Sequence, residues 1–194
     1  MAYGTFNSVL EVATTFDIKV DKETPFVQTK TIEIPTLLFT MIEKKLRDKI
    51  NYVSEYAICE TMIRPILDVI VEDYALKIWS HVAYHVDKEK GLIGEPDYLV
   101  ALRNKYGGME TPVLCVIEAK KDNFDEGWAQ ALAEMVASST RGATSCYGIV
   151  TTGAFWQFGK LESGVFIIDP VSISALRELQ YVLNIINWIF EEIK

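Results

Sequence analysis

Ionisable residues end two apolar segments in the middle of the chain. Asp97 opens the apolar run Tyr98–Leu102, and Glu118-Ala119-Lys120 closes a second run. Because strand side chains alternate between faces, Glu118 and Lys120 are expected to point to the same side. Two carboxylates and an ammonium beside an apolar sheet are costly to bury without partners. A divalent metal ion and a phosphate would supply those partners, so this spacing predicts metal-dependent phosphate chemistry.

The elements that must position these residues are predicted from apolar periodicity and turn residues. Strands are expected at 97–103, 113–120 and 146–151, with a hairpin formed by 154–158 and 164–168. Helices are expected at 36–50, 54–74, 124–139 and from Asp169-Pro170 to about 193. Ser54 should cap the second of these helices, and Pro65 should kink or divide it.

Three further segments give weaker signals. Phe16–Val20 and Thr31–Ile34 are short and β-like, and Pro35 closes them. Ala75–Val86 is ambiguous, although its latter half alternates enough to be a strand.

Helices that alternate with apolar strands predict an α/β fold, in which a central mixed sheet carries helices on both faces. The run Val113–Ile117 is continuously apolar, as expected for a central strand covered on both sides. The 194 residues contain no repeat or long linker, so residues 1–194 are expected to form a single domain.

Bulk composition narrows the function classes. The hydrophobic content of 49% and charged content of 24% are ordinary for a globular protein, and neither a membrane span nor a secretory signal is expected from the apolar runs and the first residues. The three cysteines are far apart in apolar surroundings, which predicts reduced thiols and a cytoplasmic location. The net charge of −8 counts against a protein that binds nucleic acid by general phosphate attraction.

The acidic and basic residues also match a known family pattern. Pro96-Asp97, followed after 20 intervening residues by Glu118-Ala119-Lys120, resembles the PD-(D/E)XK nuclease superfamily, also called restriction-endonuclease-like. Gln130, ten residues beyond Lys120, resembles the glutamine that many members carry. The segment 54–67 looks like the first core helix of the branch related to restriction-subunit N-terminal domains. The resemblance covers roughly residues 54–168, which leaves 1–53 and 169–194 as additions to that core.

The resemblance implies a Mg²⁺-dependent nuclease that hydrolyses phosphodiester bonds of DNA, with Mn²⁺ as a possible substitute. Asp97 and Glu118 would ligate the metal, with the carbonyl of Ala119 as a further candidate ligand. Lys120 would orient or help deprotonate the attacking water, and Gln130 would contact a water or the scissile phosphate. Superfamily members include inactive domains, so a catalytically silent binding or assembly module is the alternative, which the acidic net charge favours.

In that branch an acidic residue on the first core helix often completes the metal site, and Glu55 and Glu60 compete for this role. At about 100° per residue, the apolar residues of the helix cluster around the direction of Glu55. Glu60 lies at the edge of that stripe, so Glu55 is the expected third metal ligand. Its alternative role is that of an exposed first-turn glutamate favoured by the helix dipole.

Two other features invite a functional interpretation. His81 and His85 are four apart, but no HExxH context surrounds them and their region leans towards strand, so a helical metal pair is not favoured. The last helix is apolar on more than one face, so it either packs deep in its own domain or contributes to a homodimer. Trp188, Ile189 and Phe190 would be the anchors of that dimer.

Overall fold

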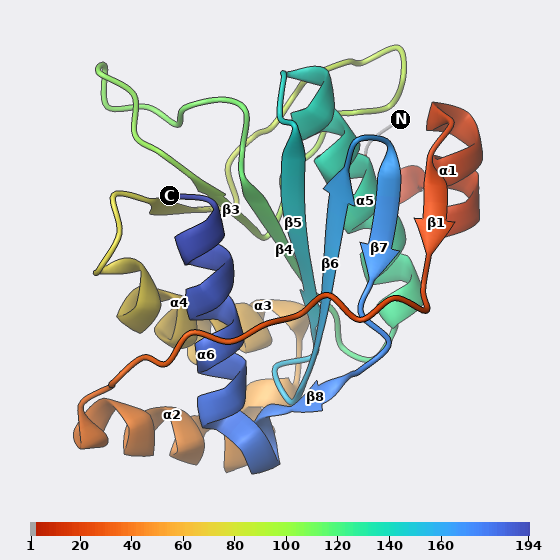
Figure 1. The fold of residues 1–194 in the computed structure, drawn as a ribbon. Helices are drawn as coiled ribbons and strands as arrows, with labels where there is room; N and C mark the ends of the chain where they lie inside the picture. The colour runs from red at the N-terminus through yellow and green to blue at the C-terminus, as the bar shows by residue number, and fades with distance from the viewer. Residues whose placement is uncertain (1–2) are drawn as a thin grey trace.

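A mixed sheet of eight strands forms the centre of the computed structural model, which describes residues 3–194 (Figure 1). Its order is β1-β7-β6-β5-β4-β3-β2, and β8 pairs with β6. Pairs β4–β5 and β1–β7 are parallel and the others are antiparallel. The strands are β1 Lys19–Asp21, β2 Lys77–Ser80, β3 Tyr98–Ala101, β4 Cys115–Ala119, β5 Ser145–Thr151, β6 Phe155–Glu162, β7 Val165–Ile168 and β8 Ile173–Ser174.

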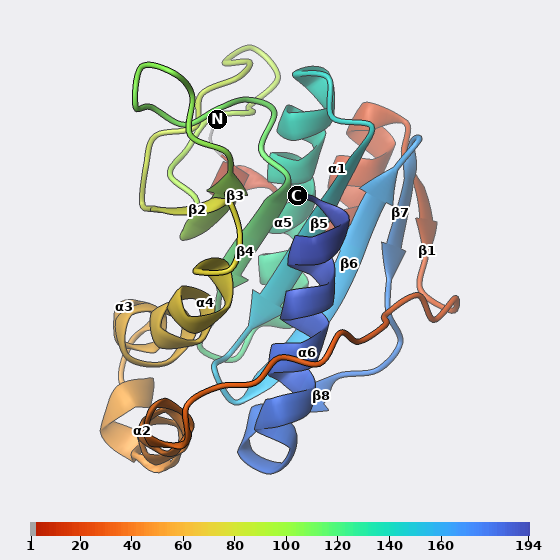
Figure 2. The same ribbon diagram turned by 60° about the vertical axis from the view of Figure 1, so that its left-hand side comes forward.

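Helices cover both faces of this sheet, as the sequence predicts (Figures 1 and 2). In Figure 1, α6 lies in front of the sheet and α5 lies behind it. The α-helices are α1 Val9–Phe16, α2 Thr36–Arg47, α3 Glu55–Ile58, α4 Arg64–Val71, α5 Phe124–Thr140 and α6 Ala175–Glu192. One apolar core joins α2, α3, α4 and α6 to the sheet, and the other joins α1 and α5 to its opposite face.

The predicted helix over 54–74 is divided, as Pro65 requires. Ser54 caps α3, since its Oγ accepts the N–H of Ala57 at 3.1 Å. A π-helical turn over Cys59–Ile63 then leads into α4, whose first turn contains Pro65. Proline has no N–H to donate, so it fits where the helical ladder restarts.

Strands β3 and β4 form the predicted buried centre of the sheet, and every residue in both is buried. Their antiparallel register pairs Tyr98 with Ile117. One step further along this register, Asp97 lies across from Glu118. The fold therefore brings the two predicted carboxylates to the same edge of the sheet.

The predictions for the N-terminal region are partly wrong. Phe16 ends helix α1, and the strand that follows covers only Lys19–Asp21. The segment 31–34 is not a strand, because its neighbour is a helix rather than another strand. There the N–H of Ile32 bonds to the Oδ1 of Asn184 on α6, at 3.2 Å.

Two other boundaries differ from the prediction. Strand β2 occupies the first part of 75–86 rather than its latter half, because His81 has a positive φ of 48° that ends the strand. Asp169-Pro170 does not start a helix. The Oδ2 of Asp169 instead accepts the N–H groups of Phe26 and Val27, at 3.0 and 3.1 Å, and α6 begins only at Ala175.

The surfaces and cysteines bear on further predictions. All three cysteines are free and buried, as expected. Trp188, Ile189 and Phe190 are buried in the chain's own core, so they are not available as dimer anchors. A homodimer therefore stays a prediction, without these residues as its anchors.

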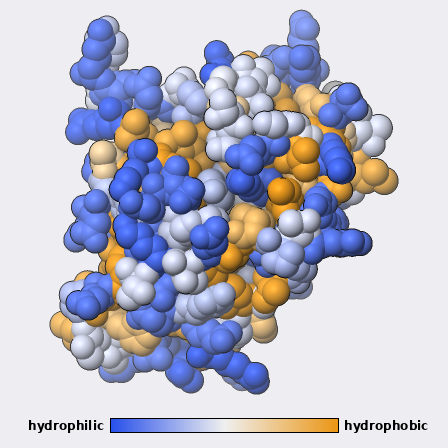
Figure 3. All heavy atoms as spheres, in the orientation of Figure 1, coloured by the Kyte–Doolittle hydropathy of each residue, from blue (hydrophilic) through white to orange (hydrophobic). Residues whose placement is uncertain are grey.

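Within residues 3–194, no helix has the length and apolar character needed to cross a bilayer. Figure 3 shows a face on which hydrophilic side chains alternate with apolar patches.

Candidate functional site

The ends of β3 and β4 hold Asp97 and Glu118 against each other. The backbone N–H of Asp97 donates to Oε1 of Glu118 at 3.3 Å. In return, the N–H of Ala119 donates to Oδ2 of Asp97 at 2.8 Å. These reciprocal contacts fix both carboxyl groups at one corner of the sheet, as the strand pairing predicts.

Lys120 completes this corner. Its Nζ lies 3.4 Å from Oε2 of Glu118, and the two side chains are only 6% and 1% exposed. The stem of Lys120 packs under α5, where Gly127 permits a close approach. A Cβ at Gly127 would come within 3.0 Å of Cγ of Lys120 and 2.5 Å of Cγ1 of Val150. The ion pair is therefore held by packing as well as by charge.

A third carboxyl group, which the sequence analysis did not identify, lies beside Glu118. Glu134 on α5 is fully buried, and neither of its oxygens has a hydrogen-bond partner within residues 3–194. Glu118 is itself an acid, so a hydrogen bond between the two side chains needs a proton on one of them. We call Asp97, Glu118, Lys120 and Glu134 the carboxylate–lysine centre.

Burial sets the protonation of this centre. It raises the pKa of Glu118 to about 7, and the charge of Asp97 adds to the effect. Burial raises the pKa of Glu134 well above its usual value, with further contributions from Glu118 and Asp97. It also raises the pKa of Asp97. Three carboxyl groups face one ammonium, so the centre holds its negative charge only with a proton or another cation.

The pKa of Lys120 is raised as well, which in a lysine favours the charged form. Burial acts to lower its pKa, but the negative charges of Glu118, Glu55 and Asp97 outweigh burial and raise that pKa above the usual lysine value. Lys120 is therefore an ammonium ion at neutral pH. It can hold an anion or orient a water, but it is a poor proton acceptor.

Comparison with known proteins assigns no family to this geometry. No protein-family model and no curated protein matches the chain. What the carboxylate–lysine centre does must be inferred from its donor atoms and their surroundings.

The donor atoms suit a hard divalent cation such as Mg²⁺, which prefers carboxylate oxygens and retained waters. The three carboxyl groups of the centre outnumber its single ammonium group, and such an ion would balance that surplus of negative charge. Among the described residues, the centre does not bring three carboxylate ligand atoms within 4.8 Å of one another. An ion held by Asp97 and Glu118 would therefore complete its coordination with water or substrate oxygens.

The remaining predicted residues lie around this centre. Glu55 does not face the core as expected: it is exposed, because the π-helical turn shifts the faces of the helix that follows it. Its Oε1 accepts the N–H of Lys121 at 3.3 Å, so it still lies beside the end of β4. Glu60 is also exposed. Gln130 is half-buried on α5, one turn before Glu134, and no hydrogen bond joins its side chain to another described residue.

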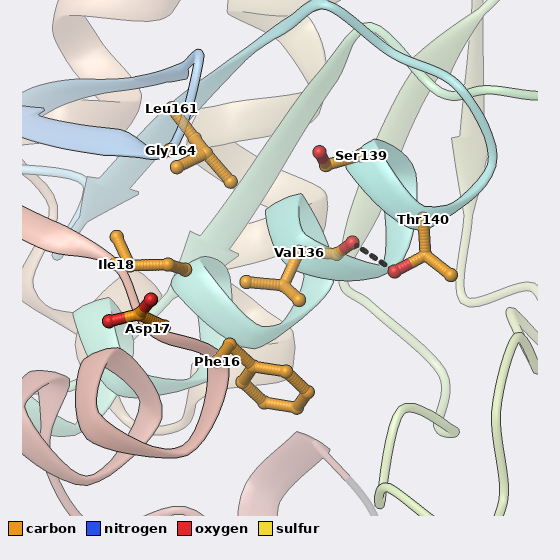
Figure 4. A pocket seen from close by; sticks show the side chains of 8 residues that line it. All are labelled: Phe16, Asp17, Ile18, Val136, Ser139, Thr140, Leu161 and Gly164. Atoms are coloured by element: carbon orange, nitrogen blue, oxygen red, sulfur yellow. Dashed lines mark hydrogen bonds between the residues drawn. The ribbon is translucent and has the colours of Figure 1, made fainter.

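A pocket of about 240 Å³ lies elsewhere, between the end of α1, the last turns of α5 and the β6–β7 turn (Figure 4). Its lining residues include Phe16, Val136 and Leu161, and the hydroxyl of Thr140 is already donated to the carbonyl of Val136. No member of the carboxylate–lysine centre lines it. The pocket mixes apolar and polar side chains and has Asp17 as its one titratable lining residue, whereas the buried titratable groups lie together at the sheet corner.

Proposed function

We propose that this protein is a Mg²⁺-dependent nuclease of the PD-(D/E)XK type that hydrolyses phosphodiester bonds in DNA. The observation that supports it best is the buried ion pair of Glu118 and Lys120 beside Asp97, at the ends of two paired central strands. Charged groups of both signs are costly to bury, and a metal ion together with a phosphate would compensate them.

In this proposal Asp97 and Glu118 hold Mg²⁺, which when bound would polarise the phosphodiester and lower the pKa of a water. Lys120 stays an ammonium ion, so its task is to orient water and offset phosphate charge rather than to accept a proton. Glu134 lies behind Glu118 and adjusts how much negative charge that carboxyl carries. Gln130 precedes Glu134 by one helical turn and would contact a water or the phosphate.

Substrate would have to approach from the side of Asp97 and Glu55. Asp97 is partly exposed and Glu55 is exposed, whereas Glu118, Glu134 and Lys120 are covered. The surroundings are acidic, and the whole chain carries a charge of −8, so we expect weak DNA binding that falls with added salt. The free cysteines support a cytoplasmic location.

A cleavage assay tests this proposal. Linear, single-stranded and branched DNA, and RNA, would be incubated with the protein and Mg²⁺ or Mn²⁺, then with a chelator. Glu118→Gln should lower cleavage by at least about 100-fold, since it removes a charge on which the transition state depends. Glu89→Gln, on an exposed turn, is the matched control and should cleave normally. Metal-independent cleavage, or equal cleavage by Glu118→Gln, would contradict the proposal.

The second candidate is a catalytically inactive module of the same fold that binds or assembles with a partner. Exposed apolar side chains on and after α2 favour it, namely Leu37, Leu38, Met41, Ile50 and Val53. Apolar atoms reach the surface over α2 in Figure 3. If no substrate is cleaved by folded protein, this candidate becomes the leading one.

A further inference from the structure

Cys59, His81 and Asp97 come together on the side of Asp97 that faces α3. Each offers one ligand atom, and these atoms lie within 4.8 Å of one another. Among residues 3–194, no other group of three His, Cys, Asp or Glu side chains comes as close. Nδ1 of His81 is 3.7 Å from Oδ1 of Asp97, the oxygen on the far side from the Ala119 contact. We propose that these three residues bind a divalent transition-metal ion of the zinc class.

The ligand set decides the class of ion. A thiolate and an imidazole favour zinc-like ions over Mg²⁺, which prefers oxygen ligands alone. In a tetrahedral zinc site, bonds of about 2.0–2.3 Å separate neighbouring ligand atoms by about 3.3–3.7 Å. The His81–Asp97 pair is already at that separation, and the thiol needs only to close in. Three protein ligands leave a fourth position, which the partly exposed side of His81 opens to water.

The surroundings hold His81 in place. Its backbone N–H donates to the carbonyl of Asp97 at 3.1 Å, and its φ of 48° lies in the left-handed region that costs most residues energy. The ring stacks on Tyr56 with centroids 6.0 Å apart and packs at a tilt against Tyr98. The imidazole is therefore oriented towards Asp97 before any ion arrives.

The position of Cys59 is also fixed by the fold. It begins the π-helical turn, a rare element that is frequent at functional sites. Its thiol is fully buried, and the Tyr98 hydroxyl beside it finds no nitrogen or oxygen partner within residues 3–194. That hydroxyl can donate to a metal-bound thiolate and stabilise its charge, as groups around metal ligands commonly do. Asp97 belongs also to the carboxylate–lysine centre, but Glu118 and Lys120 take no part in this site, so variants of Glu118 distinguish the two sites.

Cobalt(II) is the probe, because a thiolate bound to it gives a near-ultraviolet charge-transfer band that oxygen ligands do not. The reduced, chelator-treated 194-residue protein would be titrated with Co²⁺ and then with Zn²⁺. We expect one Co²⁺ per chain with this band, and loss of the band when Zn²⁺ displaces the cobalt. Cys59→Ser should remove the band, whereas Cys115→Ser, a buried cysteine on β4, should keep it.

Two more variants keep the result interpretable. His81→Asn should weaken Co²⁺ binding at least about tenfold, and asparagine tolerates the positive φ, so the fold should survive. Glu118→Gln should keep the band while it abolishes any Mg²⁺-dependent cleavage, which separates this site from the proposed nuclease centre. No band in folded wild-type protein, or a band that survives Cys59→Ser, would overturn the proposal.

Discussion

The carboxyl groups of Glu118 and Glu134 meet where almost no solvent reaches them. Burial is the main reason that the pKa of each is raised, and protonated Glu134 can donate to Glu118, which limits the rise for Glu118. Because the two groups interact, they titrate as a pair rather than one by one. A cation that binds the centre would neutralise the carboxylate charge that this proton otherwise neutralises.

Stability should therefore depend on pH. An acid with a raised folded-state pKa binds its proton more tightly when folded, so stability is full below its unfolded pKa, about 4.3, and falls as the pH rises. For Glu118 that fall extends to about 7. Glu134→Gln removes the second acid, so in chelator the variant should match wild type near pH 4.3 and exceed it by roughly 1–3 kcal/mol near pH 8.

Urea unfolding across this pH range, with Glu89→Gln as control, measures the difference. Parallel curves for wild type and Glu134→Gln would show that Glu134 does not hold the proton.

Sequence spacing identified Asp97, Glu118 and Lys120 as neighbours because strand alternation and pairing follow from local pattern. Glu134 was missed, since it stands in the alanine-rich segment 131–137 without a spacing motif. Its signal was a lone acid among apolar neighbours, four residues after Gln130. Cys59 and His81 could not be joined from sequence, because only tertiary structure brings the π-helical turn and the residue after β2 to the same side of Asp97.

Helix α5 is the element that shapes the centre, since it carries Glu134 and presses on Lys120. Gly127 permits that approach. Gly127→Ala should push Lys120 or Val150 aside, which would destabilise the fold by about 1–3 kcal/mol and lower any cleavage activity. Gly4→Ala is the control, because a Cβ there meets nothing within 4 Å. Thermal unfolding and the cleavage assay measure both effects, and equal behaviour of the two variants would contradict the role given to α5.

Two proline-containing segments show that a local sequence signal determines the structure in one place and is overridden by tertiary contacts in another. Pro65 divided its helix as predicted, because the missing N–H acts on its own turn. Asp169-Pro170 carries an equally good local signal for a helix start. There tertiary structure prevailed, since the Asp169 carboxylate bonds to backbone groups 142 and 143 residues away.

On the scale of the whole molecule, the terminal regions before residue 54 and after residue 168 are built into the central sheet and its covering helices. Strand β1 pairs with β7, and the extended segment after it runs along α6, where Lys30 donates its N–H to the carbonyl of Asn184 at 3.0 Å. The Asp169 carboxylate fastens the start of that segment. The terminal regions therefore stabilise the sheet that presents the carboxylate–lysine centre.

Asp169→Ala should release this segment. It leaves the N–H groups of Phe26 and Val27 without their acceptor, which should cost roughly 1–3 kcal/mol of unfolding free energy. Hydrogen exchange should rise at residues 26–32 and stay unchanged in β3 and β4. Protection of 26–32 equal to that in wild type would show that α6 alone holds the segment.

The central claim is that the carboxylate–lysine centre binds a hard divalent cation. Titration of chelator-treated protein with Mn²⁺, followed by the paramagnetic resonance signal of the free ion, tests it most directly. We predict one bound Mn²⁺ per chain, weakened at least about tenfold by Glu118→Gln and little changed by Cys59→Ser. Absence of Mn²⁺ binding, or binding that Glu118→Gln leaves unchanged, would contradict the claim.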